Sequence, residues 1–177
     1  ITEESHKNGK PVFAWMYARG ELPEMMGADS LFWCAQAVSA GESLGVDVVK
    51  QKFPMPAKNY TFYRDQLSKG SYFNKSMPEV EQILELEPKE GEKLDDGMNV
   101  KRLSFMAKVA PNTLKIISGG PKSEDKNGLI NTLRNVMDSG NEGQIVGRNL
   151  WGRHIDDSLR ILDDMVSLMK NTNYHRV

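Results

Sequence analysis

The order of apolar and helical segments in the sequence predicts an α/β protein with a parallel sheet. Short runs of apolar and β-branched residues alternate with segments of helical period, and turn residues separate them. Alternating strands and helices favour parallel strands joined by right-handed crossovers. Four such units make half of an eightfold barrel, whose usual length is roughly 250 residues. A compact, doubly wound domain of four strands is the alternative.

The predicted strands are apolar runs that end at polar residues or glycines, and they cover residues 11–17, 46–50, 112–118 and 144–146. A helix should follow the loop at 20–27, with Asp29 or Ser30 as its N-cap. Further helices are predicted near residues 100–109 and 130–137 and at the C-terminal end. The last of these carries apolar residues at helical spacing, namely Ile155, Leu159, Leu162, Val166 and Met169.

A long segment interrupts this alternation between the second and third strands. Residues 54–99 contain four prolines and several glycines, so we expect an inserted loop with a short helix over 76–86. Loops of this length in a compact domain are usually lids, binding loops or contact surfaces.

The amino-acid composition limits the binding partners and the cellular compartment that we expect for this protein. The chain has 177 residues, with 23 Lys and Arg against 24 Asp and Glu, so neither nucleic acid nor an anionic membrane is an expected partner. The apolar stretch 12–18 is too short to span a bilayer. Cys34 is the only cysteine and the three histidines are scattered. We therefore expect no disulfide, no metal or other cofactor, and a reducing cytoplasmic location.

Lys50 is the first candidate for chemistry, because it ends the second predicted strand behind Val48 and Val49. A lysine held against apolar walls loses hydration, which favours a neutral amine that can attack a carbonyl and form an imine. The alternative is a strand-end lysine whose stem packs while its ammonium reaches water. Lys52 lies two residues further, on the same strand face, and is the rival nucleophile.

Trp15, Tyr17 and Arg19 share one face if the first strand continues through Arg19. A phenol can act as a general acid or base, an indole provides a flat apolar wall, and a guanidinium can bind a phosphate. The alternative is core packing for the aromatic residues, with the arginine at a solvated rim.

Two glycine-containing turns each follow a strand and precede a helix; their residues are Ser118, Gly119 and Gly120 in one, and Gly147, Arg148 and Asn149 in the other. Glycines let backbone N–H groups approach a ligand, and helix N-termini favour anions. In eightfold barrels the loops after strands seven and eight commonly form a phosphate site. Each turn alone fits an ordinary tight turn, but the two together predict a phosphate site.

Four short motifs in order resemble those of the archaeal-type (DhnA-like) class I fructose-bisphosphate aldolases: WMYARG at 15–20, LGVDVVK at 44–50, SGGPK at 118–122 and VGRNLW at 146–151. The resemblance implies that residues 1–177 are the C-terminal half, strands five to eight, of a (β/α)8 TIM barrel. The segment 54–99 would then be a long insertion after strand six. A homo-oligomer is also expected.

By this resemblance, Lys50 forms the Schiff base, Tyr17 transfers protons and Trp15 lies beside the substrate. The two glycine turns would hold a phosphate of a phosphorylated sugar. The implied reaction is the reversible cleavage of fructose 1,6-bisphosphate to dihydroxyacetone phosphate and glyceraldehyde 3-phosphate, in glycolysis or gluconeogenesis. Two alternatives remain: a related Schiff-base aldolase or transaldolase-type lyase acting on another phosphorylated sugar, and a non-catalytic phosphate-binding half-barrel that needs a partner chain.

The chain departs from the family pattern in three ways. Ala18 stands where the family often has proline, the segment 54–99 is longer than usual, and strands one to four are absent with an acidic residue that the family uses in proton transfer. The chain also begins at Ile1 rather than Met. We therefore expect a longer parent polypeptide, or the N-terminal half-barrel as a second chain.

Overall fold

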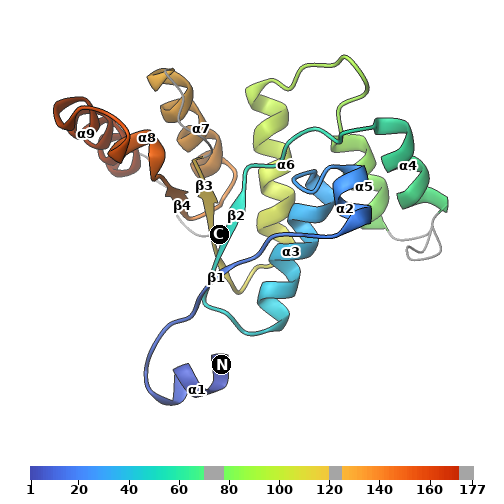
Figure 1. Cartoon of the computed structure of the whole chain (residues 1–177), viewed down its shortest axis with the longest axis horizontal. Helices are drawn as coiled ribbons and strands as arrows, with labels where there is room; N and C mark the ends of the chain where they lie inside the picture. Colours follow the sequence, from blue (N-terminus) through green and yellow to red (C-terminus); the bar gives the residue numbers. More distant parts are fainter. Residues whose placement is uncertain (70–77, 120–124, 172–177) are drawn as a thin grey trace.

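A parallel sheet of four strands forms the centre of the computed structural model, which describes residues 1–69, 78–119 and 125–171 (Figure 1). The strands lie side by side in chain order: β1 (Phe13–Trp15), β2 (Val48–Lys52), β3 (Leu114–Ser118) and β4 (Gly143–Ile145). The helices are α1 (Thr2–Lys7), α2 (Glu21–Met26), α3 (Leu31–Ser43), α4 (Tyr60–Lys69), α5 (Pro78–Leu86), α6 (Asp96–Lys108), α7 (Lys126–Asp138), α8 (Arg148–Trp151) and α9 (Ile155–Asn171). The predicted alternation of strands and helices and the parallel sheet are confirmed.

The strand register decides which side chains share a face of the sheet. Trp15 pairs with Lys50, and Lys52 pairs with Ser118. Residues paired in this way point to the same side, and each strand repeats with a period of two. Strand β2 runs to Lys52, two residues beyond its predicted end, so Lys50 and Lys52 both lie on this side. We call it the open face.

The opposite face of the sheet carries the main hydrophobic core. Val49 and Ile117 point into it and are fully buried, and they pack with residues of α3 and α6. Helix α3 lies very close to β2, because a Cβ atom on Gly41 would overlap the side chain of Val49. A second cluster joins α7 to α9 through Leu129, Leu133, Met137, Ile161 and Met165.

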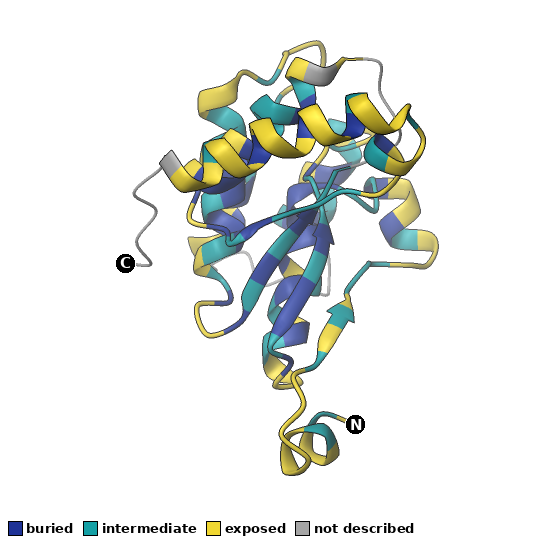
Figure 2. Ribbon diagram, turned by 90° about the vertical axis from the view of Figure 1, so that its left-hand side faces the viewer, coloured by how far each residue is buried: buried dark blue, intermediate teal, exposed yellow. Residues whose placement is uncertain are grey.

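Two apolar surfaces are left uncovered among the described residues. On the open face, Phe13 is 55% exposed and Trp15 is 58% exposed. Helix α9 packs through Ile161 and Met165, while the predicted apolar row, Ile155, Leu159, Leu162, Val166 and Met169, is exposed. Figure 2 shows exposed residues along this helix, which leads to the C-terminal end. An amphipathic helix normally packs such a row onto its sheet, so here the packing face differs from the one the spacing indicates.

The segment 54–99 contains more helix than predicted. Helix α4 was not expected, α5 lies within the predicted short helix, and α6 begins at Asp96 rather than near residue 100. Asp95 is the N-cap of α6, because its carboxylate accepts a hydrogen bond from the backbone N–H of Met98 at 2.7 Å. In Figure 1, α4 and α5 lie beyond α6 on the side away from β3 and β4.

A buried ion pair anchors this segment to the core. The Arg102 Nη2 atom lies 3.2 Å from Glu87 Oε2, and both side chains are 0% exposed. The same guanidinium donates to the carbonyl oxygen of Met55 at 3.0 Å, and the backbone N–H of Ala57 donates to Glu87. Two buried charged side chains, Arg102 and Glu87, therefore hold the loop that follows β2 through its backbone.

Candidate active site

Five polar and aromatic side chains meet at the carboxyl ends of β1 and β2, the edge where α/β barrels carry their active sites. The Lys50 Nζ atom lies 5.0 Å from the centre of the Trp15 ring. Tyr17 lies near two cations, with Lys52 Nζ at 5.5 Å and Arg19 Cζ at 5.7 Å from its ring centre. The sequence-predicted residues of the first two strands therefore form one cluster, with Lys50 one layer below Lys52.

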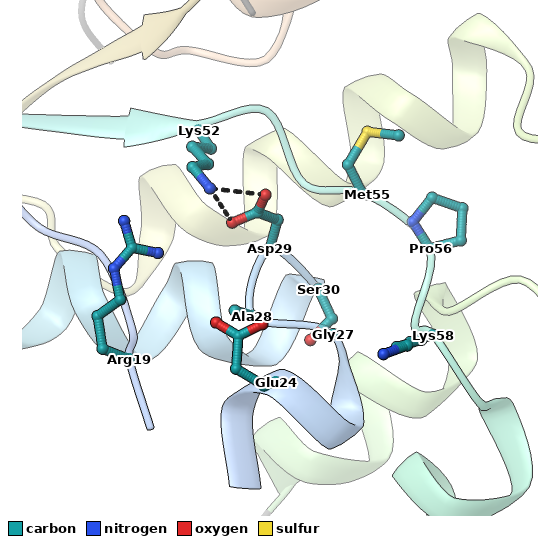
Figure 3. A pocket seen from close by; sticks show the side chains of 10 residues that line it. All are labelled: Arg19, Glu24, Gly27, Ala28, Asp29, Ser30, Lys52, Met55, Pro56 and Lys58. Atoms are coloured by element: carbon teal, nitrogen blue, oxygen red, sulfur yellow. Dashed lines mark hydrogen bonds and ion pairs between the residues drawn. The ribbon is translucent and has the colours of Figure 1, made fainter. Parts of the chain in front are cut away.

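Lys52 is held by a carboxylate that the sequence indicated only as a possible helix cap. Its Nζ atom donates to Asp29 Oδ1 at 2.7 Å and to Oδ2 at 2.8 Å (Figure 3). Ser30, not Asp29, is the N-cap residue of α3, which leaves the Asp29 carboxylate available to Lys52. An acidic and a basic residue more than twenty positions apart in the sequence give no local pattern that would predict such an ion pair.

Lys50 is bound differently. Within residues 1–69, 78–119 and 125–171, its ammonium group contacts the Trp15 ring and takes part in no ion pair. Its side chain is half-buried, like that of Lys52. The two lysines of β2 thus differ in their partners rather than in their exposure.

The end of β1 is held in place by Gln51, which is 2% exposed. Its side-chain amide donates to the carbonyl oxygen of Met16 at 2.6 Å, and its side-chain oxygen accepts from the Lys52 backbone N–H at 2.7 Å.

Burial raises the pKa of the adjacent Tyr17 phenol, and Arg19 partly opposes this effect. Tyr17 is therefore a protonated donor near neutral pH.

A pocket of about 270 Å³ opens beside Lys52. Figure 3 shows Arg19, Glu24 and Asp29 on one side of it and Met55, Pro56 and Lys58 on the other. The backbone N–H of Met55 donates to the Asp29 carbonyl oxygen at 2.8 Å, and that of Lys58 donates to Met26 at 3.1 Å. These backbone hydrogen bonds join the loop after β2 to the segment between α2 and α3, and both line the pocket.

The two glycine turns lie side by side. The Asn149 side chain donates to the carbonyl oxygen of Gly119 at 2.9 Å, which joins the turn after β3 to the turn after β4. The Gly119 N–H donates to Ile145 at 2.9 Å, so this amide is part of the sheet and does not point to a ligand. A Cβ on Gly119 would lie 2.7 Å from Val146 Cγ1, so glycine is needed for close packing.

The remaining predicted phosphate residues are placed as follows. Ser118 ends β3 on the open face, beside Lys52. Gly147 is the N-cap of the four-residue helix α8, whose first residue is the exposed Arg148. Gly120 lies outside the described residues. The sheet therefore brings Ser118 to the lysines, and the Asn149 hydrogen bond brings the Gly147 turn to Gly119.

Other potential chemistry is limited in the part of the chain that the structure describes. Burial raises the pKa of the Cys34 thiol to about 12, so it stays protonated and is no nucleophile near neutral pH. No three His, Cys, Asp or Glu side chains within the described ranges gather in a way that could hold a metal ion. Across the same ranges, none of the helices is both long and apolar enough to pass through a membrane.

The chain is similar to known aldolases in its sequence and in its fold. A model of the DeoC/LacD family aldolases matches residues 1–153. The class 1 fructose-bisphosphate aldolase of Thermoproteus tenax is 28% identical over an alignment of 123 residues that covers 67% of this chain and 44% of the relative.

Solved structures show the same fold. A crystal structure of an archaeal fructose 1,6-bisphosphate aldolase is 21% identical, with a TM-score of 0.66 over 97% of this chain and 50% of that one. An archaeal aldolase with its catalytic lysine bound to a carbinolamine intermediate gives a TM-score of 0.63 at 21% identity, over 95% of this chain and 48% of that one. The fructose-bisphosphate aldolase of Slackia heliotrinireducens gives 0.64 at 16% identity, over 99% and 48%.

The chain spans about half the length of the relatives that it matches. Its similarity to archaeal class I fructose-bisphosphate aldolases, indicated by four short motifs, is confirmed by these matches. Because the family model covers 153 of the 177 residues, the chain belongs to the DeoC/LacD family of aldolases.

Proposed function

We propose that this chain carries the imine-forming half of a class I aldolase that reversibly cleaves fructose 1,6-bisphosphate. One observation carries the proposal: Lys50 lies on the open face of a parallel sheet, two residues before the carboxyl end of β2, with its Nζ atom 5.0 Å from the centre of the Trp15 ring and one layer below Lys52 and Tyr17. An amine placed against an aromatic wall, with a phenol close by, suits attack on a carbonyl.

The steps follow from the chemistry of the imine. The neutral Lys50 amine adds to the C2 ketone, water leaves, and an iminium forms. The iminium then accepts the electron pair of the C3–C4 bond as that bond breaks, while the C4 hydroxyl loses its proton and glyceraldehyde 3-phosphate departs. In this proposal Tyr17 transfers protons at this stage. Protonation of the resulting enamine at C3 and addition of water release dihydroxyacetone phosphate and the free amine.

We place a substrate phosphate at the edge of the sheet beyond Ser118 and the Gly147 turn, with Arg148 as the nearby cation. The hydrogen bond between Asn149 and Gly119 supports this placement, because it holds the two turns together. The engaged Gly119 amide argues against that N–H as a phosphate donor. A phosphate held in this position would fix the ketone next to Lys50. Holding the reacting groups in this orientation lowers the entropic part of the barrier.

Family membership alone also suits an imine-forming lyase with another phosphorylated sugar. A panel of sugar mono- and bisphosphates assayed on the native protein distinguishes a fructose 1,6-bisphosphate aldolase from a lyase for another sugar.

We further propose a cytoplasmic location, because the one cysteine is a buried thiol.

The direct test is borohydride trapping of the native protein with dihydroxyacetone phosphate, followed by peptide mass spectrometry. Hydride reduces the iminium to a stable secondary amine, so we expect the mass of the reduced adduct on Lys50. An adduct on Lys52 would keep the reaction class and change the nucleophile. A folded protein without any adduct would contradict the aldolase function.

We also propose that a complementary set of four strands and helices, corresponding to strands one to four of the barrel, completes this structure in cis or as a second chain. Two uncovered apolar surfaces support this. The exposed rings of Phe13 and Trp15 lie on the open face, and the exposed row of α9, which includes Leu162, belongs to the helical layer of the opposite face. A second copy docked through α9 alone would leave the open face uncovered, whereas a half-barrel covers both.

Photocrosslinking of the native protein tests this completion. With p-benzoylphenylalanine at position 13 or 162, we expect crosslinks from both positions to one segment outside residues 1–177. Leu44 is 63% exposed and belongs to neither surface, so the same probe there serves as the control. Crosslinks from position 162 to α9 of another copy, or none from position 13, would contradict the proposal.

A further inference from the structure

Strand β2 places two lysines in nearly equivalent positions, and its backbone alone does not select between them. Lys50 and Lys52 share the open face, are both half-buried, and lie 5.0 Å and 5.5 Å from the centres of the Trp15 and Tyr17 rings. Lys52 is even closer to the carboxyl end of the sheet, where barrel enzymes hold their catalytic groups. A single reactive amine therefore needs a further feature of the structure.

The two lysines differ in one respect. Both carboxylate oxygens of Asp29 accept hydrogen bonds from Lys52 Nζ, at 2.7 and 2.8 Å. Lys50 takes part in no such pair within the described parts of the chain. An ammonium bound to a carboxylate has no lone pair to offer a carbonyl, and its stem is held toward the pocket wall, as Figure 3 shows.

The Asp29 carboxylate is itself well positioned. The residue precedes Ser30, the fully buried N-cap of α3. Its carbonyl oxygen accepts hydrogen bonds from the Met55 N–H at 2.8 Å and from the Cys34 thiol at 3.4 Å. The backbone at Asp29 is thus tied both to the loop after β2 and to α3, so the carboxylate stays within reach of Lys52.

We infer that Asp29 is a positioning residue that withholds Lys52 from imine formation and leaves Lys50 as the reactive amine of the open face. This inference rests on the proposed function. At Lys50 the nitrogen lone pair bonds to the ketone carbon, and the ketone oxygen takes one proton from that nitrogen and one from solvent and leaves as water. Lys52 remains an ammonium beside Tyr17, where it contributes positive charge.

Competitive acetylation of the native protein with limiting acetic anhydride measures the nucleophilicity of each lysine without any substrate. Since half-exposed ion pairs have modest strength and bidentate geometry adds to it, we expect Lys50 to react about three- to tenfold faster than Lys52. In Asp29→Asn this ratio should fall close to one, and Asp29→Glu should restore it in part. Asp65→Asn serves as a matched control, because Asp65 pairs with Lys69 at 3.3 Å on α4.

Borohydride trapping with dihydroxyacetone phosphate supplies the second readout. We expect a reduced adduct on Lys50 alone in the unmodified protein, and on both lysines in Asp29→Asn. An unchanged acetylation ratio in folded Asp29→Asn, or equal acetylation of the two lysines in the unmodified protein, would overturn the inference. If the acetylation ratio responds as expected but no adduct forms in any variant, the aldolase function fails while the effect of Asp29 on Lys52 stands.

Discussion

Replacing Lys50 with alanine is expected to lower the turnover of fructose 1,6-bisphosphate by about 10⁴-fold or more, since removal of a covalent nucleophile closes the route through the intermediate. Lys52 should not substitute for it, because both Asp29 oxygens engage its ammonium. Dihydroxyacetone phosphate should still bind, because the phosphate handle that we place at the glycine turns does not involve Lys50.

The measurements are kcat on the native protein and the binding of dihydroxyacetone phosphate by calorimetry. Lys108→Ala is a matched control, since Lys108 is an exposed lysine near the end of α6, and its turnover should match that of the unmodified protein. Turnover that survives in Lys50→Ala would exclude the imine at this residue. Loss of binding together with turnover would show that Lys50 acts in recognition as well.

The second large effect is expected at the buried ion pair. Glu87→Gln removes the charge that compensates Arg102 while keeping the shape of the side chain. Both partners are 0% exposed, so the variant should lose roughly 3 to 5 kcal/mol in the free energy of unfolding. Burial raises the pKa of Glu87 and lowers that of Arg102, which means that each charge depends on the other.

Urea unfolding of the native protein, followed by circular dichroism, measures this loss. Glu85→Gln is the matched control, because Glu85 is exposed on α5 and its replacement should change stability by no more than about 0.5 kcal/mol. The Glu87 variant should also bind substrate less well, since Arg102 and Glu87 hold the loop that forms part of the pocket wall. A change below about 1 kcal/mol would mean that the pair contributes little net stability.

The sheet was predictable from sequence because its strands are distinctive. β-Branched and apolar runs ending at glycine or lysine carry their own signal, and the parallel order follows from alternation with helices. Helix α9 shows where this reasoning fails. Apolar residues occupy adjacent positions in α9, as in Ile161 with Leu162 and Met165 with Val166, so two neighbouring rows exist. Only contact with α7 and α8 decides which row is buried, and spacing carries no information about that contact.

The candidate active site was likewise predictable from sequence only in part. Trp15, Tyr17 and Lys50 could be grouped because their strand positions and motifs place them at one edge of the sheet. The partner of Lys52 could not be identified, since Asp29 is separated from it by all of α3 and reads locally as a cap. The engaged amide of Gly119 was equally hidden, because a glycine after a strand suits both a ligand contact and close packing against Val146.

Helix α3 fixes the position of Asp29 relative to strand β2 through contacts at both of its ends. Near its C-terminal end, Gly41 brings the helix backbone against Val49, and just before its first residue stands the carboxylate that holds Lys52. A bulkier residue at position 41 would lift the helix from the sheet, and Asp29 would move with it. The choice between two amines at one end of β2 is therefore coupled to the absence of a side chain at Gly41, where the helix backbone meets Val49.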